Sequence, residues 1–591
     1  MTLAREVPRT QPQAGDLSCE IVTSFARLNE LRAEWDRLWH SDDRGEIFQN
    51  YAWVRAFWSG YGKELELCTI VVRDRNRILG ILPLAVHAGI LRFLGSPRSD
   101  YNDIVCEEFS AAAVLERALD DLLQLATWNR CILDNVSELS RIARYLPLLP
   151  PRLKSHLQRF VASPCPTITL NGGETLRKSV RTHVRRQSRK LERLGGFTFR
   201  HMENEPGIER HLNVLFRQHM ERQAFRHEPS QFAGTQSREY FRAMALDASL
   251  RPWLRFGVLE LESQPLAYHF GFEANGKYLW YKPSFSIDYY DYSPGELLLS
   301  EVVKNAAESG LREVDLTIGD EPYKLRFATH VRQNFVICVL RDRGDVRGWM
   351  TSWLQHTKEQ IREKPSVLQF ARNAKQRVRQ TWHHLRLRVT REGMIRSGAA
   401  AVRAAWRTAI WSADNMTLVH FSQQECQVEP RKQREIVVQR STLGELALAS
   451  IPYADLITEP EFQLVRERVK AGSELYLVRD GGKFVQYALA CESAEIPVGS
   501  DTQPKPFAIN EVAFVVHRLW TAPEAADRQA LFTGLIRSFG ELARGRGREL
   551  YVFLRERDLA RSQIAGATVK LRLAQQRLFH KLRFESVRRF V

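Results

Sequence analysis

Hydrophobic and polar positions in the middle of the chain follow first the two-residue period of β-strands and then the longer period of an α-helix. Three strand-like runs between 253 and 286 are separated by the polar stretch "ESQP" and by Asn275-Gly276, the strongest short signal for a tight hairpin. A helix is predicted over 294–309, and further strands at 312–318 and 334–340. This order predicts an antiparallel meander, a flanking helix, and a strand that returns beside the meander in a mixed sheet.

The same order of elements recurs on both sides of this region, which indicates internal repetition. Upstream, a hairpin, a helix and a strand are predicted at 66–86, 111–126 and 130–136. Downstream, a hairpin at 474–493 and a strand at 509–520 precede a helix through about Ala543 and a strand at 548–554. We expect an α/β protein with mixed sheets, built from three such modules. Unrelated α/β domains that share a common order are the alternative.

These patterns divide the chain into five segments. We expect a disordered tail, a first module, a second module, a basic helical linker and a third module at 1–17, 18–164, 165–343, 344–412 and 413–591. A chain of 591 residues is too long for one core, and a hydrophobic content of 44% supplies enough apolar residues for several.

Eight cysteines are scattered along the chain, without a CxxC pair or a Cys/His cluster at metal-ligand spacing. This usage is typical of a reduced, cytosolic protein, and no metal cofactor is expected. No basic-then-apolar leader opens the sequence, and no apolar run approaches the about 18 residues that span a membrane. We therefore expect a cytoplasmic protein.

The net charge of +17 is concentrated between Val346 and Ile410, where Lys and Arg far outnumber Asp and Glu. Basic residues recur there among Leu, Val and Trp, a pattern of amphipathic helices that lie on anionic membranes. That interpretation would place the protein peripherally at the inner membrane. A solvated linker whose apolar faces pack on the flanking modules is the competing interpretation. Nucleic-acid binding is less favoured, because no reading motif accompanies the charge.

The start of the central helix is the first candidate site. Ser293 suits the N-cap position and Pro294 the first turn, so the stretch can be simple helix punctuation. The same first turn carries unpaired N–H groups and the positive end of the helix dipole, which attract phosphate.

Five short stretches carry a resemblance to a known family: "EWDRLW", "GILPL", "FLGSPRSDYNDIV", "SPGELLL" and "GDEPYKLRF". Over residues 18–345 the chain resembles the GNAT acyltransferase superfamily and, more narrowly, its CelD-like branch, bacterial proteins associated with cellulose and exopolysaccharide synthesis. That branch is related to the Fem peptidyltransferases, which carry two GNAT modules in tandem. The resemblance implies tandem GNAT-like modules in the first two thirds of the chain.

The resemblance also implies that acetyl-CoA or another acyl-CoA is the co-substrate, with its pyrophosphate at the helix N-terminus. The matching positions are Ser293, Gly295, Glu296 and Leu297, and Gly295 allows close backbone approach. The family's usual Arg/Gln-x-x-Gly-x-Gly/Ala signature is absent. Glu296 places an anion where phosphate would lie.

Acyl transfer from a thioester requires a neutral attacking group, a stabilised oxyanion and protonation of the leaving thiolate. Tyr323 matches the position of a thiolate-protonating tyrosine in the resembled family, and Lys324 is a candidate contact for a phosphate or the acceptor. Asp288 and Tyr281 complete the catalytic candidates. The loop around Asp288 can equally be a hydrogen-bonded turn, and Lys324 a solvated surface residue.

Candidate substrate-binding residues come from an upstream loop and a helix. Asp100, Tyr101 and Asp103 follow a Gly/Pro turn and would touch the acceptor in a tandem arrangement, although an Asx turn explains them equally. His219 is a candidate acceptor-site or core histidine. The basic helix at 177–194 is expected to be a solvated face, with phosphate or anionic glycan contact as the alternative.

The third module departs most from the resembled pattern. Its counterpart of the phosphate loop, within 522–535, lacks glycine at the critical turn, and Asp527 adds negative charge. The stretch 578–587 is similar to the closing strand region of GNAT proteins. We expect a GNAT-like domain that has lost coenzyme binding.

The leading hypothesis is an acyltransferase of N-acetyltransferase type. It would move an acyl group from acyl-CoA to an amine or hydroxyl of a sugar or cell-envelope (exopolysaccharide) precursor. We expect acyl-CoA and a small-molecule or glycan acceptor as partners. Fem-like aminoacyl transfer from charged tRNA is an alternative. A non-catalytic GNAT-fold assembly protein for polysaccharide synthesis is the alternative from another class.

Overall fold

The computed structural model describes residues 12–41, 45–170, 176–202, 205–226, 228–341, 413–421, 436–453, 457, 459–500, 503–522, 525, 528–555, 570–579 and 584–588. The chain forms two compact units, residues 1–219 with 231–368 and residues 220–230 with 369–591. The basic linker predicted at 344–412, Asp527 and the first eleven residues of the predicted tail lie outside the described residues.

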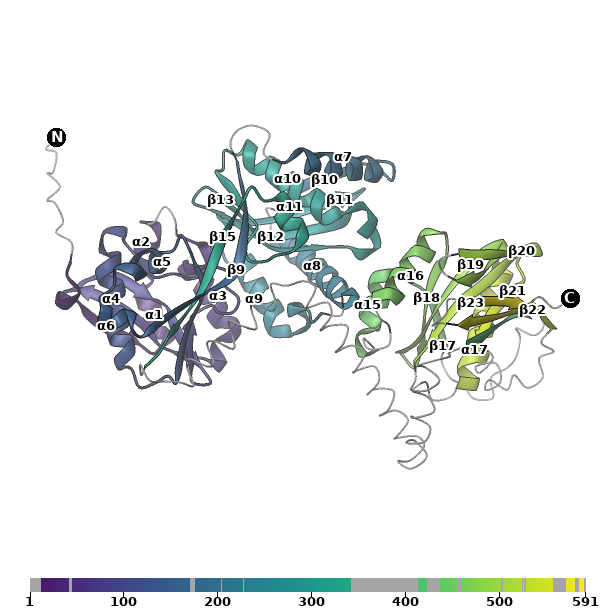
Figure 1. The fold of residues 1–591 in the computed structure, drawn as a ribbon, viewed down its shortest axis with the longest axis horizontal. Coiled ribbons are helices and arrows are strands. Elements are labelled where there is room, and N and C mark those ends of the chain that lie inside the picture. Colours follow the sequence, from purple (N-terminus) through teal and green to yellow (C-terminus); the bar gives the residue numbers. More distant parts are fainter. Residues whose placement is uncertain are drawn as a thin grey trace, which may run out of the picture. The chain divides into compact units, whose positions relative to one another are not determined.

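The first unit contains a small sheet and a large one (Figure 1). The small sheet has the strand order β1-β3-β4-β7, with β1 Ser18–Val22, β3 Thr69–Asp74, β4 Arg77–Leu82 and β7 Val105–Cys106. The eleven-stranded sheet has the order β10-β11-β12-β13-β14-β9-β15-β8-β6-β5-β2. Its strands are β2 Glu66–Leu67, β5 Leu84–His87, β6 Ile90–Phe93, β8 Arg130–Ser137, β9 Leu157–Thr169, β10 Phe197–His201, β11 Leu254–Leu261, β12 Gln264–Ala274, β13 Lys277–Phe285, β14 Glu313–Asp315 and β15 His330–Val339.

Helices flank these sheets. They are α1 Phe25–Glu30, α2 Arg32–His40, α3 Tyr51–Tyr61, α4 Ala111–Gln124, α5 Arg141–Tyr145, α6 Pro151–Lys154, α7 Lys178–Glu192, α8 Glu205–Phe225, α9 Thr235–Leu246, α10 Pro294–Glu308 and α11 Pro322–Phe327. α4 packs on the small sheet, and α10 lies across the β11–β12–β13 meander with α7 beside it. The predicted meander and central helix are confirmed by β11–β13 and α10, and the fold class of mixed α/β sheets is confirmed.

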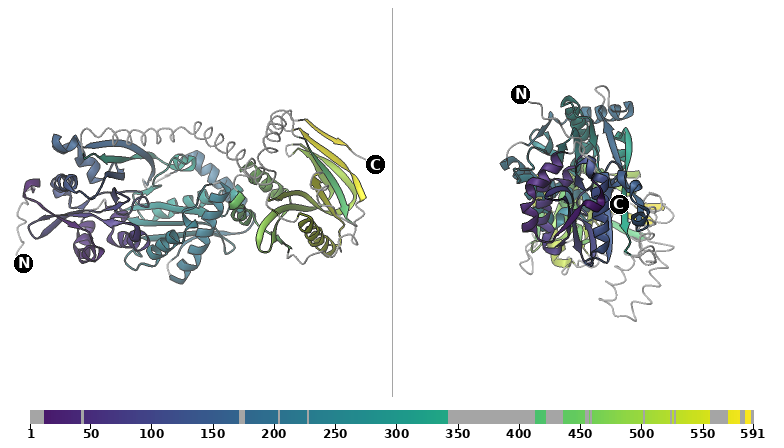
Figure 2. Two further views of the ribbon diagram at one scale, coloured as in Figure 1. Left: turned by 90° about the horizontal axis from the view of Figure 1, so that it is seen from below. Right: turned by 90° about the vertical axis from the view of Figure 1, so that its left-hand side faces the viewer.

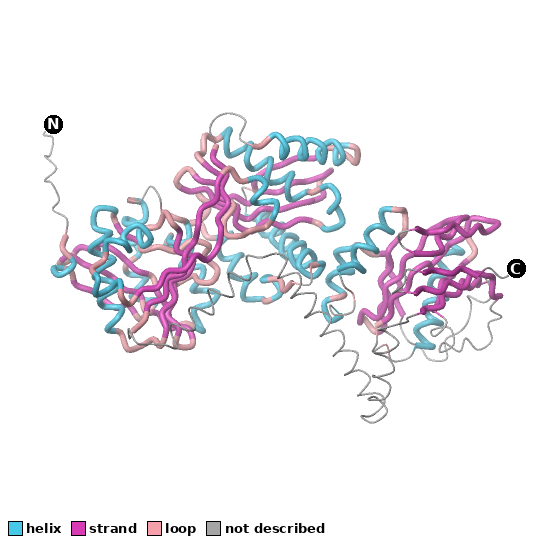
Figure 3. The backbone as a smooth tube through the Cα atoms, in the orientation of Figure 1, coloured by secondary structure: helices cyan, strands magenta, loops and turns pink. Residues whose placement is uncertain are grey.

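We call the part of the first unit that precedes β9 its first half, and the part between β9 and β15 its second half. A long antiparallel pair, β9 with β15, joins these two halves. β9 also pairs with β14 at 167–169, and β15 also pairs with β8 at 334–339. Figure 3 shows the pair as long magenta strands running from one half to the other. The boundary predicted at 164/165 therefore falls inside β9, and strands from both sides of that boundary share one sheet.

Each half of the first unit keeps its own hydrophobic core. In the first half, α4 buries Val114, Leu115, Ala118, Leu119 and Leu122, which follow the helical period, against the strands. In the second half, α10 buries Leu298, Leu299 and Val302 against Trp280 and the meander. These cores fix α10 over the end of β13, where the candidate site lies.

The second unit contains one eight-stranded sheet with the order β17-β18-β19-β20-β21-β16-β22-β23. Its strands are β16 Ala413–Phe421, β17 Ile436–Arg440, β18 Glu474–Asp480, β19 Lys483–Ser500, β20 Gln503–Thr521, β21 Leu550–Arg555, β22 Lys570–Phe579 and β23 Phe584–Arg588; its helices are α15 Leu443–Ala449, α16 Glu459–Lys470 and α17 Arg528–Gly545. α17 packs on the sheet through β17 and β21 (Figure 2). The predicted hairpin at 474–493 forms β18 and β19.

Within the described ranges, no helix combines the length and the apolar character needed to cross a membrane. The same part of the chain holds no group of three or more His, Cys, Asp or Glu side chains suited to a metal ion.

Candidate functional site

β13 and β14 separate to form a fork beneath α10. They pair in parallel only at 277–279 with 313–315, and beyond that point they diverge. At the apex the hydroxyl of Thr317 donates to the carbonyl of Trp280 at 3.2 Å. We call residues 280–285 of β13 and residues 316–319 after β14 the fork. Within the fork the two strands no longer pair with each other.

A β-bulge in β13 lies at the apex of the fork. On β12 the pairing advances from Phe272 to Phe270, whereas on β13 it advances from Leu279 to Lys282, so β13 carries one extra residue. The Tyr281 N–H donates to Nε2 of the buried His269 at 3.1 Å, and the His269 ring stacks on Trp280 with centroids 4.2 Å apart. Burial lowers the pKa of His269 well below its ordinary value, which keeps Nε2 an acceptor.

The start of α10 differs from the expected cap. Ser293 is the N-cap by position, but its backbone is left-handed with φ 51°, and its hydroxyl makes no capping hydrogen bond. The expectation of a side-chain cap at Ser293 is therefore wrong. The hydroxyl instead accepts from Nε2 of Gln187 on α7 at 3.4 Å.

The Ser293 carbonyl accepts the backbone N–H groups of Glu296 at 3.0 Å and Leu297 at 3.1 Å. Because Pro294 has no N–H, Gly295 supplies the one first-turn donor for which the described residues offer no partner. A Cβ at position 295 would lie 3.2 Å from the Phe285 ring, so the glycine allows α10 to approach β13 closely.

Glu296 lies at the positive end of α10 and is already paired. Its carboxylate is 2.6 Å from the Arg326 guanidinium on α11 and 3.4 Å from Nε2 of His183 on α7. Acidic side chains are stabilised at a helix N-terminus, and Arg326 adds a second cation. Arg326 was not among the site residues predicted from the sequence, although it lies only two positions after Lys324.

Tyr323 and Lys324 lie on α11 at the open side of the fork. The Tyr323 hydroxyl accepts from the Trp280 indole N–H at 3.3 Å. Lys324 is 5% exposed, and its Nζ donates to the Ile318 carbonyl at 2.7 Å, so the interpretation of Lys324 as a solvated surface residue is wrong. Burial opposes its charge, but Tyr323, Glu321 and Asp100 together raise its pKa.

Of the other two catalytic candidates, Tyr281 is buried and Asp288 is exposed. Tyr281 is 3% exposed, and its hydroxyl donates to the Arg98 carbonyl at 2.6 Å while its ring packs against Phe48 and Phe241. Asp288 is exposed on the 3₁₀ turn η7, Ile287–Tyr292, which leads into α10. Tyr281 thus anchors the loop that follows β6.

That loop brings two predicted residues to the second half of the unit. Asp100 Oδ1 lies 4.0 Å from Lys282 Nζ on β13. The buried Tyr101 hydroxyl donates to Asp315 Oδ1 on β14 at 2.7 Å. Burial raises the pKa of Asp315. Sequence reasoning missed Lys282 and Asp315, whose signal was a charged residue inside an apolar strand.

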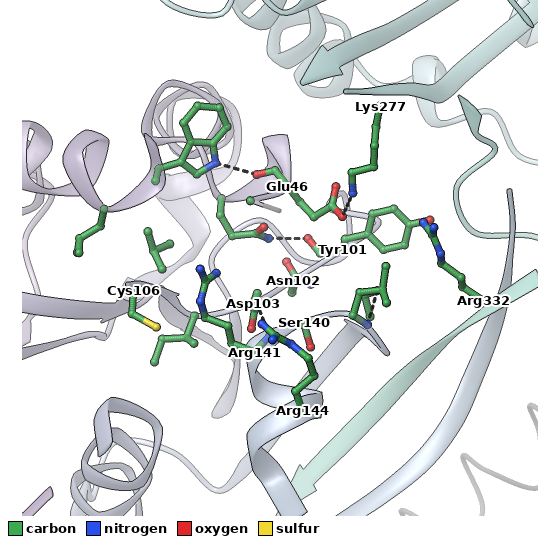
Figure 4. A pocket seen from close by; sticks show the side chains of 18 of the residues that line it. Glu46, Tyr101, Asn102, Asp103, Cys106, Ser140, Arg141, Arg144, Lys277 and Arg332 are labelled. Carbon is green, nitrogen blue, oxygen red and sulfur yellow. Dashed lines mark hydrogen bonds and ion pairs between the residues drawn. The ribbon is translucent and has the colours of Figure 1, made fainter. Parts of the chain in front are cut away.

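A pocket of about 450 Å³ has Tyr101, Asn102 and Asp103 of the same loop in its wall (Figure 4). Residues of this loop, of α5 and of the strands of the large sheet line it. In Figure 4 the Lys277 side chain meets Glu46, and the Nζ–Oε1 distance is 2.5 Å. Arg141 and Arg144 of α5 and Arg332 of β15 also line the pocket.

Carboxylates accompany these cations. Arg332 pairs with Glu313 at 2.5 Å, and Arg144 pairs with Glu108 at 2.6 Å. Asp103 accepts the backbone N–H groups of Arg141 at 2.7 Å and Ile142 at 3.0 Å, so it holds the first turn of α5. Burial raises the pKa of Asp103 to about 6, against the lowering effect of these hydrogen bonds.

His219 does not join either group of contacts described above. It is 7% exposed on α8, and its ring lies edge-on to Phe232 with centroids 4.9 Å apart. The structure thus brings Asp100 and Lys324 to the fork and Tyr101 and Asp103 to the pocket.

Comparison with protein families gives a match in the second half of the first unit. Residues 178–325 match the acetyltransferase (GNAT) domain family. The matched segment runs from α7 through the meander and the fork to α11, and so includes α10. No curated protein matches the chain.

Solved structures with low sequence identity to the chain cover about half of it. FemX is 11% identical, with 55% of this chain and 98% of that chain covered and a TM-score of 0.38. A tandem GNAT protein from the clavulanic acid biosynthesis pathway is 13% identical, with coverages of 54% and 98% and a TM-score of 0.31. L-PGS from Bacillus licheniformis is 13% identical, with coverages of 52% and 96% and a TM-score of 0.36.

Proposed function

We propose that the protein is a GNAT-type acyltransferase that takes its acyl group from acyl-CoA. The observation that supports the proposal most is the fork with α10 above it, inside the segment that matches the acetyltransferase domain family. The pantetheine arm would lie between the diverging strands, and the pyrophosphate would meet the Gly295 N–H at the start of α10. His183 of α7 and Arg326 of α11 both contact Glu296 in the first turn of α10.

The proposed chemistry uses groups close to the apex. Tyr323 would donate its proton to the leaving thiolate, because its hydroxyl is held beside Trp280 at the apex. Lys324, kept cationic by its neighbours, would stabilise negative charge that develops on the thioester oxygen. Asp100 and the exposed Asp288 remain the candidate carboxylates for accepting a proton.

The acceptor would bind in the pocket that Tyr101, Asn102 and Asp103 line, next to Asp100 in the sequence. The loop that carries Asp100 to the fork carries Tyr101 and Asp103 to the pocket wall. Cationic and anionic side chains occur together in that wall, which suits a hydroxylated or amino sugar with anionic groups. The CelD-like resemblance favours a cell-envelope or exopolysaccharide precursor.

Calorimetry with acetyl-, propionyl- and longer acyl-CoA tests the proposal. We expect micromolar or tighter binding of at least one of them to the full chain. Gly295→Leu should abolish binding, because the side chain fills the space between α10 and Phe285. Gly196→Leu is the matched control, since nothing lies within 4 Å of a Cβ there. A folded protein that binds none of the thioesters refutes the acyl-CoA assignment and favours an assembly role.

Aminoacyl transfer from charged tRNA is the second candidate, and one observation favours it. The exposed side chains of α7 include Arg185, Arg186, Arg189 and Lys190, next to the start of α10. Such a surface predicts tRNA binding that weakens steeply as salt rises. Equal affinity for tRNA and for random RNA of the same length would argue against this candidate.

A further inference from the structure

Three titratable side chains from three different elements meet at the open side of the fork. Lys282 comes from β13, Lys324 from α11, and Asp100 from the loop of the first half. Lys282 Nζ is 4.0 Å from Asp100 Oδ1, and Lys324 Nζ is held by the Ile318 carbonyl at 2.7 Å. Lys282 is the residue at which β13 resumes its pairing with β12 after the bulge.

Lys282 differs from the other lysines near α10. Its side chain is 22% exposed, and its Nζ lies 4.0 Å from the centroid of the Tyr281 ring. The charged groups that act on it are Asp100 and Glu321, which favour its cation, and Lys324 and Arg98, which oppose it. Burial is the largest effect, and the pKa of Lys282 is lowered. A larger fraction of this amine is therefore neutral and nucleophilic than of an exposed lysine.

We propose that Lys282 is an acylation site of this protein, at which its own amine takes the acyl group of a thioester seated in the fork. The inference rests on the proposed function, since it requires acyl-CoA in the fork. It adds a covalent product that the proposed transfer to a separate acceptor does not require.

The step balances without any further reactant. The neutral Lys282 nitrogen attacks the thioester carbonyl carbon, a C–N amide bond forms, and the C–S bond breaks. The proton that the nitrogen loses passes to the departing sulfur, so free CoA leaves as the thiol. The amide carries no charge, and the ion pair of Lys282 with Asp100 is lost. Acylated protein should therefore bind a second acyl-CoA more weakly, because the added group fills the fork.

Mass spectrometry of the full chain incubated with acetyl-CoA tests the proposal. We expect one acetyl group per chain at Lys282, formed at least about tenfold faster at pH 7 than at Lys304, because the bound thioester is held beside Lys282 alone. Lys304 is an exposed lysine on α10 and serves as the internal control. Free CoA should suppress labelling of Lys282 but not of Lys304.

One variant and one alternative acyl donor distinguish acylation of Lys282 from binding of acyl-CoA alone. Lys282→Arg keeps the positive charge and should remove the single acetyl group while binding of acetyl-CoA, measured by calorimetry, is retained. Acetyl phosphate, which has no CoA moiety, should favour Lys282 over Lys304 much less than acetyl-CoA does. Binding of acetyl-CoA without acetylation of Lys282 overturns this inference alone. A preference for Lys282 over Lys304 that is as strong with acetyl phosphate as with acetyl-CoA overturns it as well. Absence of binding overturns the proposed function instead.

Discussion

The hydroxyl of Tyr101 donates to Asp315 Oδ1 at 2.7 Å and joins two residues 214 positions apart. Tyr101 lies in the loop of the first half, and Asp315 ends β14 at the apex of the fork. The same oxygen accepts the Thr317 N–H at 2.8 Å, and the Thr317 hydroxyl in turn binds the Trp280 carbonyl. The shape of the fork thus depends on a loop that is remote in sequence.

Tyr101→Phe should destabilise the first unit by about 1.5–3 kcal/mol, because a buried hydrogen bond to a charged group is lost. The check is the midpoint of urea unfolding followed by tryptophan fluorescence. Tyr145→Phe is the matched control, since it removes a hydroxyl that donates to Glu108 at 2.9 Å on the surface. Equal effects of the two variants would show that the Tyr101–Asp315 bond adds nothing specific to the buried site.

Lys277→Met should lower the free energy of unfolding by about 3–5 kcal/mol, because it leaves the Glu46 carboxylate in the pocket without its partner at 2.5 Å. Adding Glu46→Gln should recover part of the loss, since the uncompensated charge is then removed. Unfolding curves of the single and double variants provide the measurement, with Lys304→Met as an exposed control. A double variant no more stable than Lys277→Met would contradict a charge-based explanation.

The fold class could be predicted from sequence because each element carries its own periodic signal. The "Asn-Gly" hairpin between β12 and β13 and the apolar stripe of α10 are local features, and both were predicted with nearly correct bounds. The joining of both halves through β9 and β15 was not predicted, because strand pairing over a long sequence separation leaves no local pattern.

The candidate site was predicted only in part for the same reason. The stretches around Asp100 and Tyr323 are unusual in composition and were noticed. Lys282 and Asp315 each appear as one polar residue in an apolar strand, and their roles depend on partners from distant loops. The left-handed backbone of Ser293 likewise follows from the turn before α10, and the serine itself suggested an ordinary cap.

The stability of the first unit should depend on Asp103 between about pH 4 and pH 6. Its folded-state pKa is about 6, above the ordinary value of 3.8, so in this window the folded state holds a proton that the unfolded state has lost. Stability contributed by this group therefore falls as pH rises through the window, by up to about 3 kcal/mol, and is constant above it. The difference in unfolding free energy between wild type and Asp103→Asn, measured at several pH values, should change by that amount. A difference that is flat with pH would contradict the assigned burial.

Glu296→Gln should tighten binding of acyl-CoA about threefold to tenfold. In the proposed complex the Glu296 carboxylate lies near the pyrophosphate at the start of α10, and it holds Arg326 at 2.6 Å. Removing its charge relieves repulsion of the pyrophosphate and leaves Arg326 available to the phosphates. Each of these effects has the free energy typical of charges at a helix N-terminus.

Arg326→Gln should have the opposite effect, and Glu308→Gln, at the exposed end of α10, should change nothing. Calorimetry with acetyl-CoA at low and high salt provides the measurement, and the gain should shrink at high salt because the interaction is electrostatic. Weaker binding by folded Glu296→Gln would mean that the pyrophosphate does not meet this helix start.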